Sequence, residues 1–121
     1  MSKILIVDDS LDLLEFLTVM FKARKYETVT ASTIAEAMKS LLTFSPDVIL
    51  LDVKFPDSDG RDFCRKIKSD SQTCKTPVIL ISASPDLLEN YHECKADAVI
   101  EKPFDIKIRY DTIESLSLLK R

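Results

Sequence analysis

The chain has 121 residues, of which 45% are hydrophobic and 31% are charged, and its formal net charge is −3. These values predict one ordinary globular domain with one core, covering residues 1–121, and the acidic balance argues against direct binding to nucleic acid. No apolar run approaches the roughly 18 residues that a membrane span needs. The chain has three cysteines at unrelated spacings and one histidine, so reduced thiols in the cytoplasm are the expectation, rather than disulfides or a metal–thiolate site.

The first predicted element is a short apolar run at residues 4–7, which is typical of a strand buried on both faces. This run ends on two acids, Asp8 and Asp9. Residues from about 10 to 24 carry apolar side chains at helical spacing, which predicts an amphipathic helix. The apolar positions of this helix are Leu13, Leu14, Leu17, Met20 and Phe21.

Residues 27–31 are rich in threonine and valine and predict a second strand. Thr33 and Glu36 form a T-x-x-E capping box, which opens a second predicted helix. The apolar positions of that helix are Ala37, Met38, Leu41 and Leu42. Pro46 then closes the loop before the next strand.

The stretch at residues 48–60 is the one around which the rest of the chain is organised. Its apolar run at 48–51 predicts a third strand that is buried on both faces and that ends on Asp52. Residues 56–60 favour a turn, so the chain leaves the sheet there. A short third helix follows, with apolar positions at Phe63, Cys64 and Ile67.

The last third of the chain repeats this alternation of elements. The predicted elements are a strand at 78–81, a helix at about 85–93, a strand at 96–100 and a helix at about 104–119. Ser82 ends the fourth strand, Pro85 suits the first turn of the fourth helix, and Lys102 follows the fifth strand. In the last helix, a core-facing stripe is predicted at Ile106, Tyr110, Ile113 and Leu116. Ile108 and Leu118 or Leu119 fall outside this stripe. Two explanations are open: the end of the helix frays, or these side chains contact a partner.

Five strands alternating with five helices predict an α/β fold, a single doubly wound parallel sheet with right-handed crossovers. Polar side chains follow four of the strands: Asp8 and Asp9, Asp52, Ser82, and Lys102. Because the carboxyl ends of parallel strands share one edge, where such folds bind ligands, these side chains should meet in one pocket. Taken singly, each has an ordinary alternative, such as a helix cap for Asp9 or a solvated surface position for Lys102. Their joint occurrence indicates a functional site.

The residue types in this pocket point to phosphoryl transfer. Three carboxylates repel one another unless a cation lies among them, so neutralising one should stabilise the ion-free fold. Ligands that are all oxygen favour Mg²⁺. We interpret Asp52 as a nucleophile that accepts a phosphoryl group and forms an acyl phosphate. Lys102 would add positive charge, Ser82 a hydroxyl, and the backbone N–H groups of Val53 and Ala83 would complete the cage.

Four segments of the chain form a recognisable pattern. They are VDDS at residues 7–10, LLDVKFPDSDG at 50–60, ISAS at 81–84 and EKPF at 101–104. With this order and spacing, the chain resembles the receiver domain of two-component response regulators over its full length. The resemblance implies the flavodoxin-like and CheY-like sheet order 2-1-3-4-5. It also implies a phosphoryl-accepting signalling switch in the cytoplasm that is not a classical enzyme, with at most Mg²⁺-dependent self-phosphorylation and autodephosphorylation.

The resemblance also assigns individual roles in the pocket. Asp52 would be the phosphoacceptor and Asp9 a direct Mg²⁺ ligand. Asp8 would act on the ion through water, and the carbonyl of Lys54 would be a further ligand.

The same resemblance makes Ser82 the switch hydroxyl and Lys102 the phosphoryl-binding lysine, with a cis peptide bond expected at Lys102–Pro103. The implied donor is a sensor histidine kinase or a phosphotransfer protein. The implied output surface is the face formed by the fourth helix, the fifth strand and the fifth helix. An unidentified partner or a second copy of the chain would bind there, and neither nucleic acid nor a membrane is an expected partner.

Three positions depart from the family pattern. Val99 stands three residues before the lysine, where the family often has an aromatic ring. Lys95 stands where the family prefers glycine, so a positive φ there would carry strain. The segment from Ser82 to Lys102 is also short, which predicts a short or irregular fourth helix.

Two other classes of function fit the sequence less well than a phosphoryl-accepting switch. Haloacid-dehalogenase-like phosphatases also use an aspartyl phosphate, but they need a second Asp two residues after the nucleophile, where this chain has Lys54. An interaction module that works without phosphorylation usually lacks one of the acids or the lysine, and this chain has lost none of them. His92, the only histidine, is predicted to be a solvent-facing helix residue and not a phosphodonor.

Overall fold

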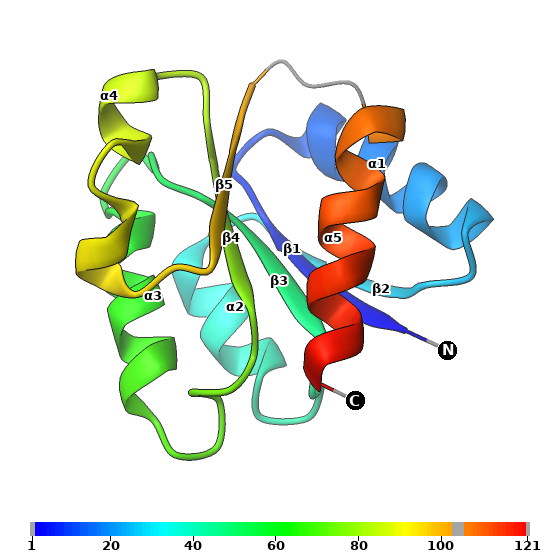
Figure 1. Ribbon diagram of the computed structural model, residues 1–121, viewed down its shortest axis with the longest axis horizontal. Coiled ribbons are helices and arrows are strands. Elements are labelled where there is room, and N and C mark those ends of the chain that lie inside the picture. The colour runs from blue at the N-terminus through cyan, green and yellow to red at the C-terminus, as the bar shows by residue number, and fades with distance from the viewer. Residues whose placement is uncertain (1, 103–105, 121) are drawn as a thin grey trace.

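A five-stranded sheet forms the centre of the molecule, and helices cover both of its faces (Figure 1). The computed structural model describes residues 2–102 and 106–120, with side chains in the last helix described for residues 110–118. The strands are β1 (Lys3–Val7), β2 (Glu27–Ala31), β3 (Val48–Asp52), β4 (Val78–Ser82) and β5 (Ala98–Glu101). The helices are α1 (Leu11–Ala23), α2 (Ile34–Ser40), α3 (Gly60–Ser69), α4 (Pro85–Leu88), the 3₁₀ helix η1 (Tyr91–Cys94) and α5 (Ile106–Lys120).

All strand pairs in the sheet are parallel, and the order is β2-β1-β3-β4-β5. The predicted doubly wound α/β fold and its strand order are therefore confirmed. Leu51 in β3 lies opposite Val7 in β1 and Leu80 in β4, so the ends of these strands are nearly level. Every residue of β3 and β4 is buried, as the apolar runs predicted.

The sheet separates two hydrophobic cores, whereas the sequence analysis predicted one. On one face, α1 and α5 bury Phe21 and Ile113 against the sheet, and on the other face α3 buries Phe63 (Figure 1). Successive side chains of a strand point to opposite faces, so Ile49 joins one core and Leu50 the other. Among the residues that the structure describes, no helix has the length and apolarity that crossing a membrane would require.

Side-chain caps fix the residues at which α1 and α2 begin. The Ser10 hydroxyl accepts a hydrogen bond from the Leu13 N–H at 3.3 Å, and the Thr33 hydroxyl accepts one from the Glu36 N–H at 3.1 Å. The predicted cap at Thr33 is confirmed. The Glu36 carboxylate, however, accepts from the N–H of Ser32, one residue before the cap, at 2.9 Å.

Helix α2 is shorter than its apolar pattern predicted. It ends at Ser40, and Leu42, beyond its end, has an exposed fraction of 82%. Met38, inside the helix, is 45% exposed. These two apolar side chains therefore lie on the surface, although Ala37 and Leu41 do contact the core.

Helix α5 is attached to the start of β2 by polar and aromatic contacts. The Tyr26 and Tyr110 hydroxyls both donate to one oxygen of Glu114, at 2.6 and 2.8 Å, and the Arg24 guanidinium lies 4.4 Å from the centre of the Tyr110 ring. The predicted core stripe is confirmed at Ile113, which is fully buried, and at Tyr110, which packs against the same core. Leu116 also packs there, and Leu118 is exposed, whereas the side chains of Ile106, Ile108 and Leu119 lie outside the described residues.

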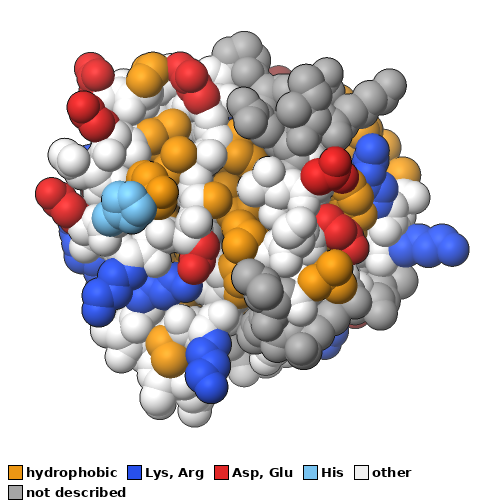
Figure 2. Space-filling model, viewed as in Figure 1, with side chains coloured by type: hydrophobic (Ala, Val, Ile, Leu, Met, Phe, Trp, Pro, Cys, Tyr) orange, Lys and Arg blue, Asp and Glu red, His pale blue; other side chains and the backbone are white. Residues whose placement is uncertain are grey.

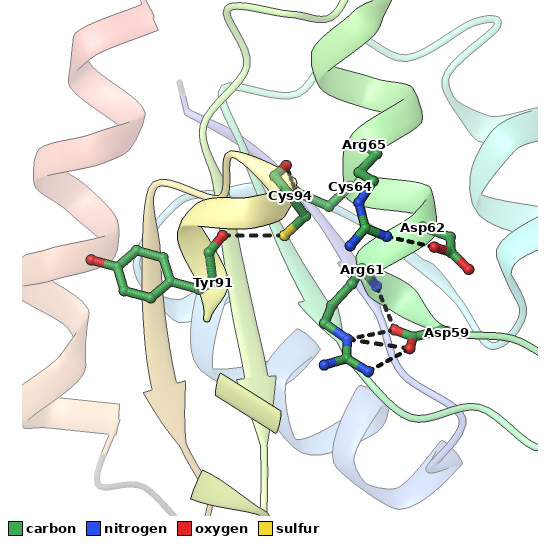
Figure 3. Close-up of polar contacts among 7 residues, drawn as sticks. All are labelled: Asp59, Arg61, Asp62, Cys64, Arg65, Tyr91 and Cys94. Atoms are coloured by element: carbon green, nitrogen blue, oxygen red, sulfur yellow. Dashed lines mark hydrogen bonds and ion pairs between the residues drawn. The ribbon is translucent and has the colours of Figure 1, made fainter. Parts of the chain in front are cut away.

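The segment between β4 and β5 contains less α-helix than the predicted range of 85–93. Helix α4 covers four residues, and the chain then forms η1, as the prediction of a short or irregular fourth helix anticipated. Lys95 ends η1 with φ 64°, the left-handed conformation in which glycine is less strained. The buried Cys64 thiol of α3 donates to the Cys94 carbonyl at 3.2 Å, which holds η1 against α3 (Figure 3). His92 is exposed on this turn, as predicted.

Gly60 allows α3 to begin directly against the end of β3. A Cβ atom added to Gly60 would lie 1.9 Å from the carbonyl oxygen of Asp52 and 3.1 Å from the Cα of Val53. The Gly60 N–H donates to the Val53 carbonyl at 2.7 Å. The only glycine of the chain is therefore required by the close approach of two backbone segments.

We expect Gly60→Ala to lower the melting temperature by the equivalent of about 2 kcal/mol or more, because the contacting atom is backbone and cannot rotate away. Thermal unfolding followed by circular dichroism would measure the shift. Lys66→Ala, at an exposed position of the same helix, is the matched control and should change the melting temperature little. Equal melting temperatures for the two variants would contradict this account of Gly60.

Candidate functional site

Side chains from four strand ends meet at one edge of the sheet, as the sequence predicted. They line an open cavity of about 760 Å³ that includes Asp9, Asp52, Ser82 and Lys102. Asp8 does not line the cavity and has no exposed surface, but it lies beside Lys102 and close to Asp52. Residues that are up to 94 positions apart in the chain are thus brought into contact.

Three carboxylates form the acidic part of the site. One oxygen from each of Asp8, Asp9 and Asp52 lies within 4.8 Å of the other two. Asp52 is 5% exposed because β3 carries it to the surface only at its last residue, whereas Asp9 is exposed after the end of β1. The sequence-based expectation that these acids converge is therefore met by the geometry.

Lys102 joins the acids as an ion-pair partner. Its Nζ lies 2.6 Å from Asp8 Oδ2 and 3.5 Å from Asp52 Oδ1. The other oxygen of Asp8 accepts a hydrogen bond from the Ser10 N–H at 2.9 Å. Asp8 is thus held from two sides, and it positions both the lysine and the start of α1. The sequence pattern did not reveal this role, because nothing in the spacing shows which acid the lysine would prefer.

The electrostatic surroundings raise the pKa of Asp52 from 3.8 to about 6. Burial away from water is the main cause, and repulsion from Asp8 adds to it. The Lys102 ammonium lowers this pKa, Asp9 raises it, and a hydrogen bond from the Lys54 backbone N–H lowers it. The ionised form of Asp52 is therefore less stable in the folded protein than in water, and nearby positive charge would favour it.

The backbone around Asp52 offers several polar groups to a ligand. The Val53 N–H donates to the Ile81 carbonyl at 3.1 Å, so it is already engaged within the sheet. The Lys54 N–H, which the sequence analysis did not single out, is the group that contacts the Asp52 carboxylate. Within the described ranges, the Ala83 N–H has no hydrogen-bond acceptor. The roles of Val53 and Ala83 as phosphoryl-binding groups remain predictions.

Ser82 lies at the end of β4, where it links the site to the following loop. Its side chain is buried, and its hydroxyl accepts a hydrogen bond from the Ser84 N–H at 3.1 Å. The Ser82 carbonyl accepts from the Lys102 N–H at 2.8 Å. The hydroxyl can still donate its own proton, so it can bind an additional oxygen in the cavity.

The loop that follows Asp52 is held in place by its own contacts. Lys54 and Asp59 face each other as an antiparallel bridge. Asp59 caps α3 by accepting from the Arg61 N–H at 2.9 Å, and its carboxylate also binds the Arg61 side chain, at 2.7 Å for the shortest contact (Figure 3). These hydrogen bonds keep the pKa of Asp59 below its usual value. Lys54 therefore has a defined place beside the cavity.

The donor set fits a hard divalent cation. It consists of oxygens alone, and the carbonyl of Lys54 receives no hydrogen bond from the part of the chain that the structure describes. Mg²⁺ prefers oxygen ligands and is usually bound by one or two carboxylates, with room left for phosphate. The observed cluster and cavity meet these requirements.

Comparison with known proteins identifies the family. The sequence matches the family model for the response regulator receiver domain over residues 4–113. The chain belongs to the response regulator receiver domain family. Receiver domains are the signalling switches of two-component systems and bind Mg²⁺ in an acidic pocket, which agrees with the aspartate cluster of this receiver domain.

Two curated relatives and one solved structure show how far the similarity extends. This receiver domain is 36% identical over 117 residues to the transcriptional regulatory protein YxdJ of Bacillus subtilis, covering 95% of the chain and 50% of the relative. It is 32% identical over 107 residues to the DNA-binding response regulator MtrA of Mycobacterium tuberculosis, covering 87% and 46%. The chain therefore spans about half the length of these relatives.

The solved structure is the signal receiver domain of a signal transduction histidine kinase from Syntrophus aciditrophicus, with 31% identity and a TM-score of 0.88. The alignment covers 98% of this chain and 91% of the other. The family and fold implied by the sequence motifs are thus confirmed. The predicted cis bond at Lys102–Pro103 involves Pro103, which lies outside the described residues.

We expect Asp52→Asn to raise the melting temperature of the receiver domain at pH 7 without divalent cations. Because the folded-state pKa of Asp52 is raised to about 6, its ionisation destabilises the fold progressively between about pH 4 and pH 6, and the full penalty remains above pH 6. The penalty is on the order of 2–3 kcal/mol. The stabilisation should therefore disappear near pH 4, as thermal unfolding across pH would show.

Asp8→Asn provides an informative comparison for Asp52→Asn. Repulsion among the carboxylates alone predicts that Asp8→Asn also stabilises the ion-free protein. The substitution would, however, weaken the contact of residue 8 with Lys102. We therefore expect Asp8→Asn to raise the melting temperature less than Asp52→Asn does, or to lower it. Asp62→Asn, at an exposed site, is the control, and a lower melting temperature for Asp52→Asn at pH 7 would contradict the repulsion argument.

Proposed function

We propose that this chain accepts a phosphoryl group on Asp52 from a sensor histidine kinase or a phosphotransfer protein. The observation that supports this function most directly is the contact of Lys102 with both Asp8 and Asp52 in an acidic cavity. The lysine supplies positive charge beside a carboxylate that is nearly buried and lines this cavity. That arrangement suits the approach of an anionic phosphoryl group to an anionic nucleophile.

In the proposed reaction, one oxygen of Asp52 attacks phosphorus, and the bond between phosphorus and the donor atom breaks. Asp9, Asp52 and the Lys54 carbonyl would hold Mg²⁺, with Asp8 acting through water. When bound, the ion supplies charge neutralisation for the phosphoryl oxygens. Lys102 and the Ser82 hydroxyl would bind phosphoryl oxygens directly, and the backbone N–H of Ala83 would complete the cage. The Val53 N–H would join it only by releasing the Ile81 carbonyl.

The Ser82 hydroxyl offers a route from the phosphoryl group to the output surface. It presently accepts from the Ser84 N–H, and Ser84 precedes α4. Turning this hydroxyl toward a phosphoryl oxygen would alter the loop before α4 and bias the conformation of the α4–β5–α5 face. The half-buried Val99 of β5 packs against the core under this face. Because valine has no aromatic ring that could change its rotamer, the conformational change would pass through the loop before α4.

The α4–β5–α5 face is the proposed binding surface for the output partner. Figure 2 shows hydrophobic side chains gathered in a strip over the middle of this side of the molecule, with charged side chains at its borders. Such a strip suits an unidentified protein partner or a second copy of the chain. Two relatives are named as DNA-binding or transcriptional regulators, but this acidic domain is not expected to bind nucleic acid itself. We place its exchange with the kinase in the cytoplasm.

A phosphatase function has less support. The position two residues after Asp52 is Lys54, where haloacid-dehalogenase-like phosphatases need a second Asp. Self-phosphorylation from small donors and autodephosphorylation are the most enzymatic activities that we propose for this chain.

Incubation with acetyl phosphate and Mg²⁺ should add one phosphoryl group to the wild-type protein, as measured by intact mass spectrometry. Asp52→Asn should remove the added mass, because an amide does not form the acyl phosphate. Asp57→Asn, an exposed acid in the following loop, is the matched control and should be labelled as the wild type is. Undiminished labelling of Asp52→Asn would remove Asp52 from the proposed role.

Mg²⁺ should raise the melting temperature, since a ligand that binds only the folded state adds about 2.7 kcal/mol at a concentration 100 times its Kd. Asp9→Asn should abolish most of this increase, because it removes a proposed ligand of the ion. Asp9 is exposed and forms no hydrogen bond or ion pair among the described residues, so the change should not disturb the fold. Asp12→Asn, the next acid along the chain, should leave the increase intact. A wild-type protein that shows no heat of Mg²⁺ binding in calorimetry would instead favour an interaction module that works without phosphorylation.

A further inference from the structure

A second groove, the α2–α3 groove, is formed by these two helices and the turns that follow them, and none of its lining residues belongs to the cavity beside Asp52. Its apolar lining includes Leu41, Phe63 and Ile67, which contact the core on this face of the sheet. Helix α3 begins beside Asp52 and runs from there toward the opposite end of the molecule (Figure 1). A molecule bound in the α2–α3 groove would therefore leave the cavity beside Asp52 open.

The lining of the α2–α3 groove exposes two apolar side chains to solvent. Leu42, in the turn after α2, has an exposed fraction of 82%, and Met38, inside α2, is 45% exposed. The groove has a volume of about 210 Å³. A leucine side chain has four carbon atoms, each with roughly the bulk of a water molecule, about 30 Å³. The same surface therefore presents a protruding leucine and a hollow large enough to receive one.

Two exposed charges of opposite sign line the same groove. Lys66 and Asp70 are four positions apart at the end of α3, so they lie on one face of the helix. Across residues 2–102 and 106–120, the Lys66 side chain forms no ion pair or hydrogen bond, and the Asp70 side chain only accepts a hydrogen bond from the Gln72 N–H, at 2.8 Å. Both charges are therefore available to a partner.

Two-fold symmetry would use the leucine, the hollow and the charges together. In a two-fold dimer, the same patch of each copy contacts the other, and every contact occurs twice. With the two α3 helices antiparallel across the axis, Lys66 of each copy lies opposite Asp70 of the other, which gives two ion pairs. Leu42 of each copy can then enter the groove of the other. A surface with charges of only one sign would lack this self-complementarity.

We propose that the α2–α3 groove is the contact surface of a homodimer, in which Leu42 fills the groove of the second copy and Lys66 pairs with Asp70 across the axis. Exposed ion pairs add little affinity and mainly fix the register, so burial of Leu42 and Met38 provides most of the stabilisation. A contact centred on a groove of this size gives weak and reversible association. No residue of α4, β5 or α5 lines the groove, so the dimer can still bind an output partner.

Sedimentation equilibrium of the full chain, at protein concentrations from about 10 µM to about 1 mM, tests the dimer. We expect the wild-type protein to associate reversibly and Leu42→Glu to weaken the association about 10-fold or more, because a charge would enter each apolar groove. Leu118→Glu changes an exposed apolar side chain of α5 in the same way. It is the matched control and should leave the dissociation constant unchanged. All the substituted side chains are exposed, so the variants should fold, and their melting temperatures would verify this.

Charge reversal tests the arrangement across the axis. Lys66→Glu alone brings two acids together in each pair, and Asp70→Lys alone brings two cations together, so each should weaken the dimer about 10-fold at low salt. An equimolar mixture of the two variants should restore the association, because every pair across the axis then joins opposite charges again. A mixture that associates no better than either variant alone would overturn the two-fold arrangement.

A wild-type protein that stays monomeric at about 1 mM would overturn the interface, and so would a Leu42→Glu variant that associates as the wild type does. A dimer that is lost in Leu118→Glu and kept in Leu42→Glu would place the contact on α5 instead. Labelling by acetyl phosphate should be equal for Leu42→Glu and the wild type, since the groove and the cavity share no residue. Reduced labelling of the folded variant would contradict this separation.

Discussion

The ion pair between Lys102 and Asp8 is the interaction on which the site depends. It joins the residue after β5 to the residue after β1, on either side of the central strand β3. Asp8 has no exposed surface, so its negative charge is tolerable only because the ammonium and the Ser10 N–H satisfy its two oxygens. The same ammonium lies 3.5 Å from Asp52. One lysine thus compensates the buried acid Asp8 and also lies beside Asp52.

The backbone contact between Gly60 and Asp52 complements this ion pair. Charge places Lys102, but it does not fix the direction in which the Asp52 backbone leaves the sheet. The close approach of α3 fixes this direction. Gly60 has no side chain, so the start of the helix packs directly against the carbonyl of Asp52. The hydrogen bond from the Gly60 N–H to the Val53 carbonyl then holds the chain immediately after Asp52. The carboxylate is therefore presented by a rigid support on both sides.

Much of this arrangement could be predicted from the sequence. Unbroken apolar runs that end on Asp8, Asp52 and Ser82 identified buried parallel strands, and such strands bring their ends to one edge. The bounds of α4 could not be read from these runs, because the helical pattern of 85–93 does not show that the chain leaves the α-helix after Leu88 and forms η1; only the family resemblance predicted a short helix there. The sequence also did not show that Lys102 pairs more closely with Asp8 than with Asp52, since this depends on distances of a few ångströms between side chains.

The bond from Lys102 to Asp8 spans 94 residues of the chain. A contact of such long range forms only after the intervening strands have taken their places, because the loop it closes carries a large entropic cost until then. A partly folded copy of the chain therefore has Asp52 but lacks the lysine and the acids that surround it in the folded protein. Under the proposed function, only molecules that have completed their folding would accept a phosphoryl group.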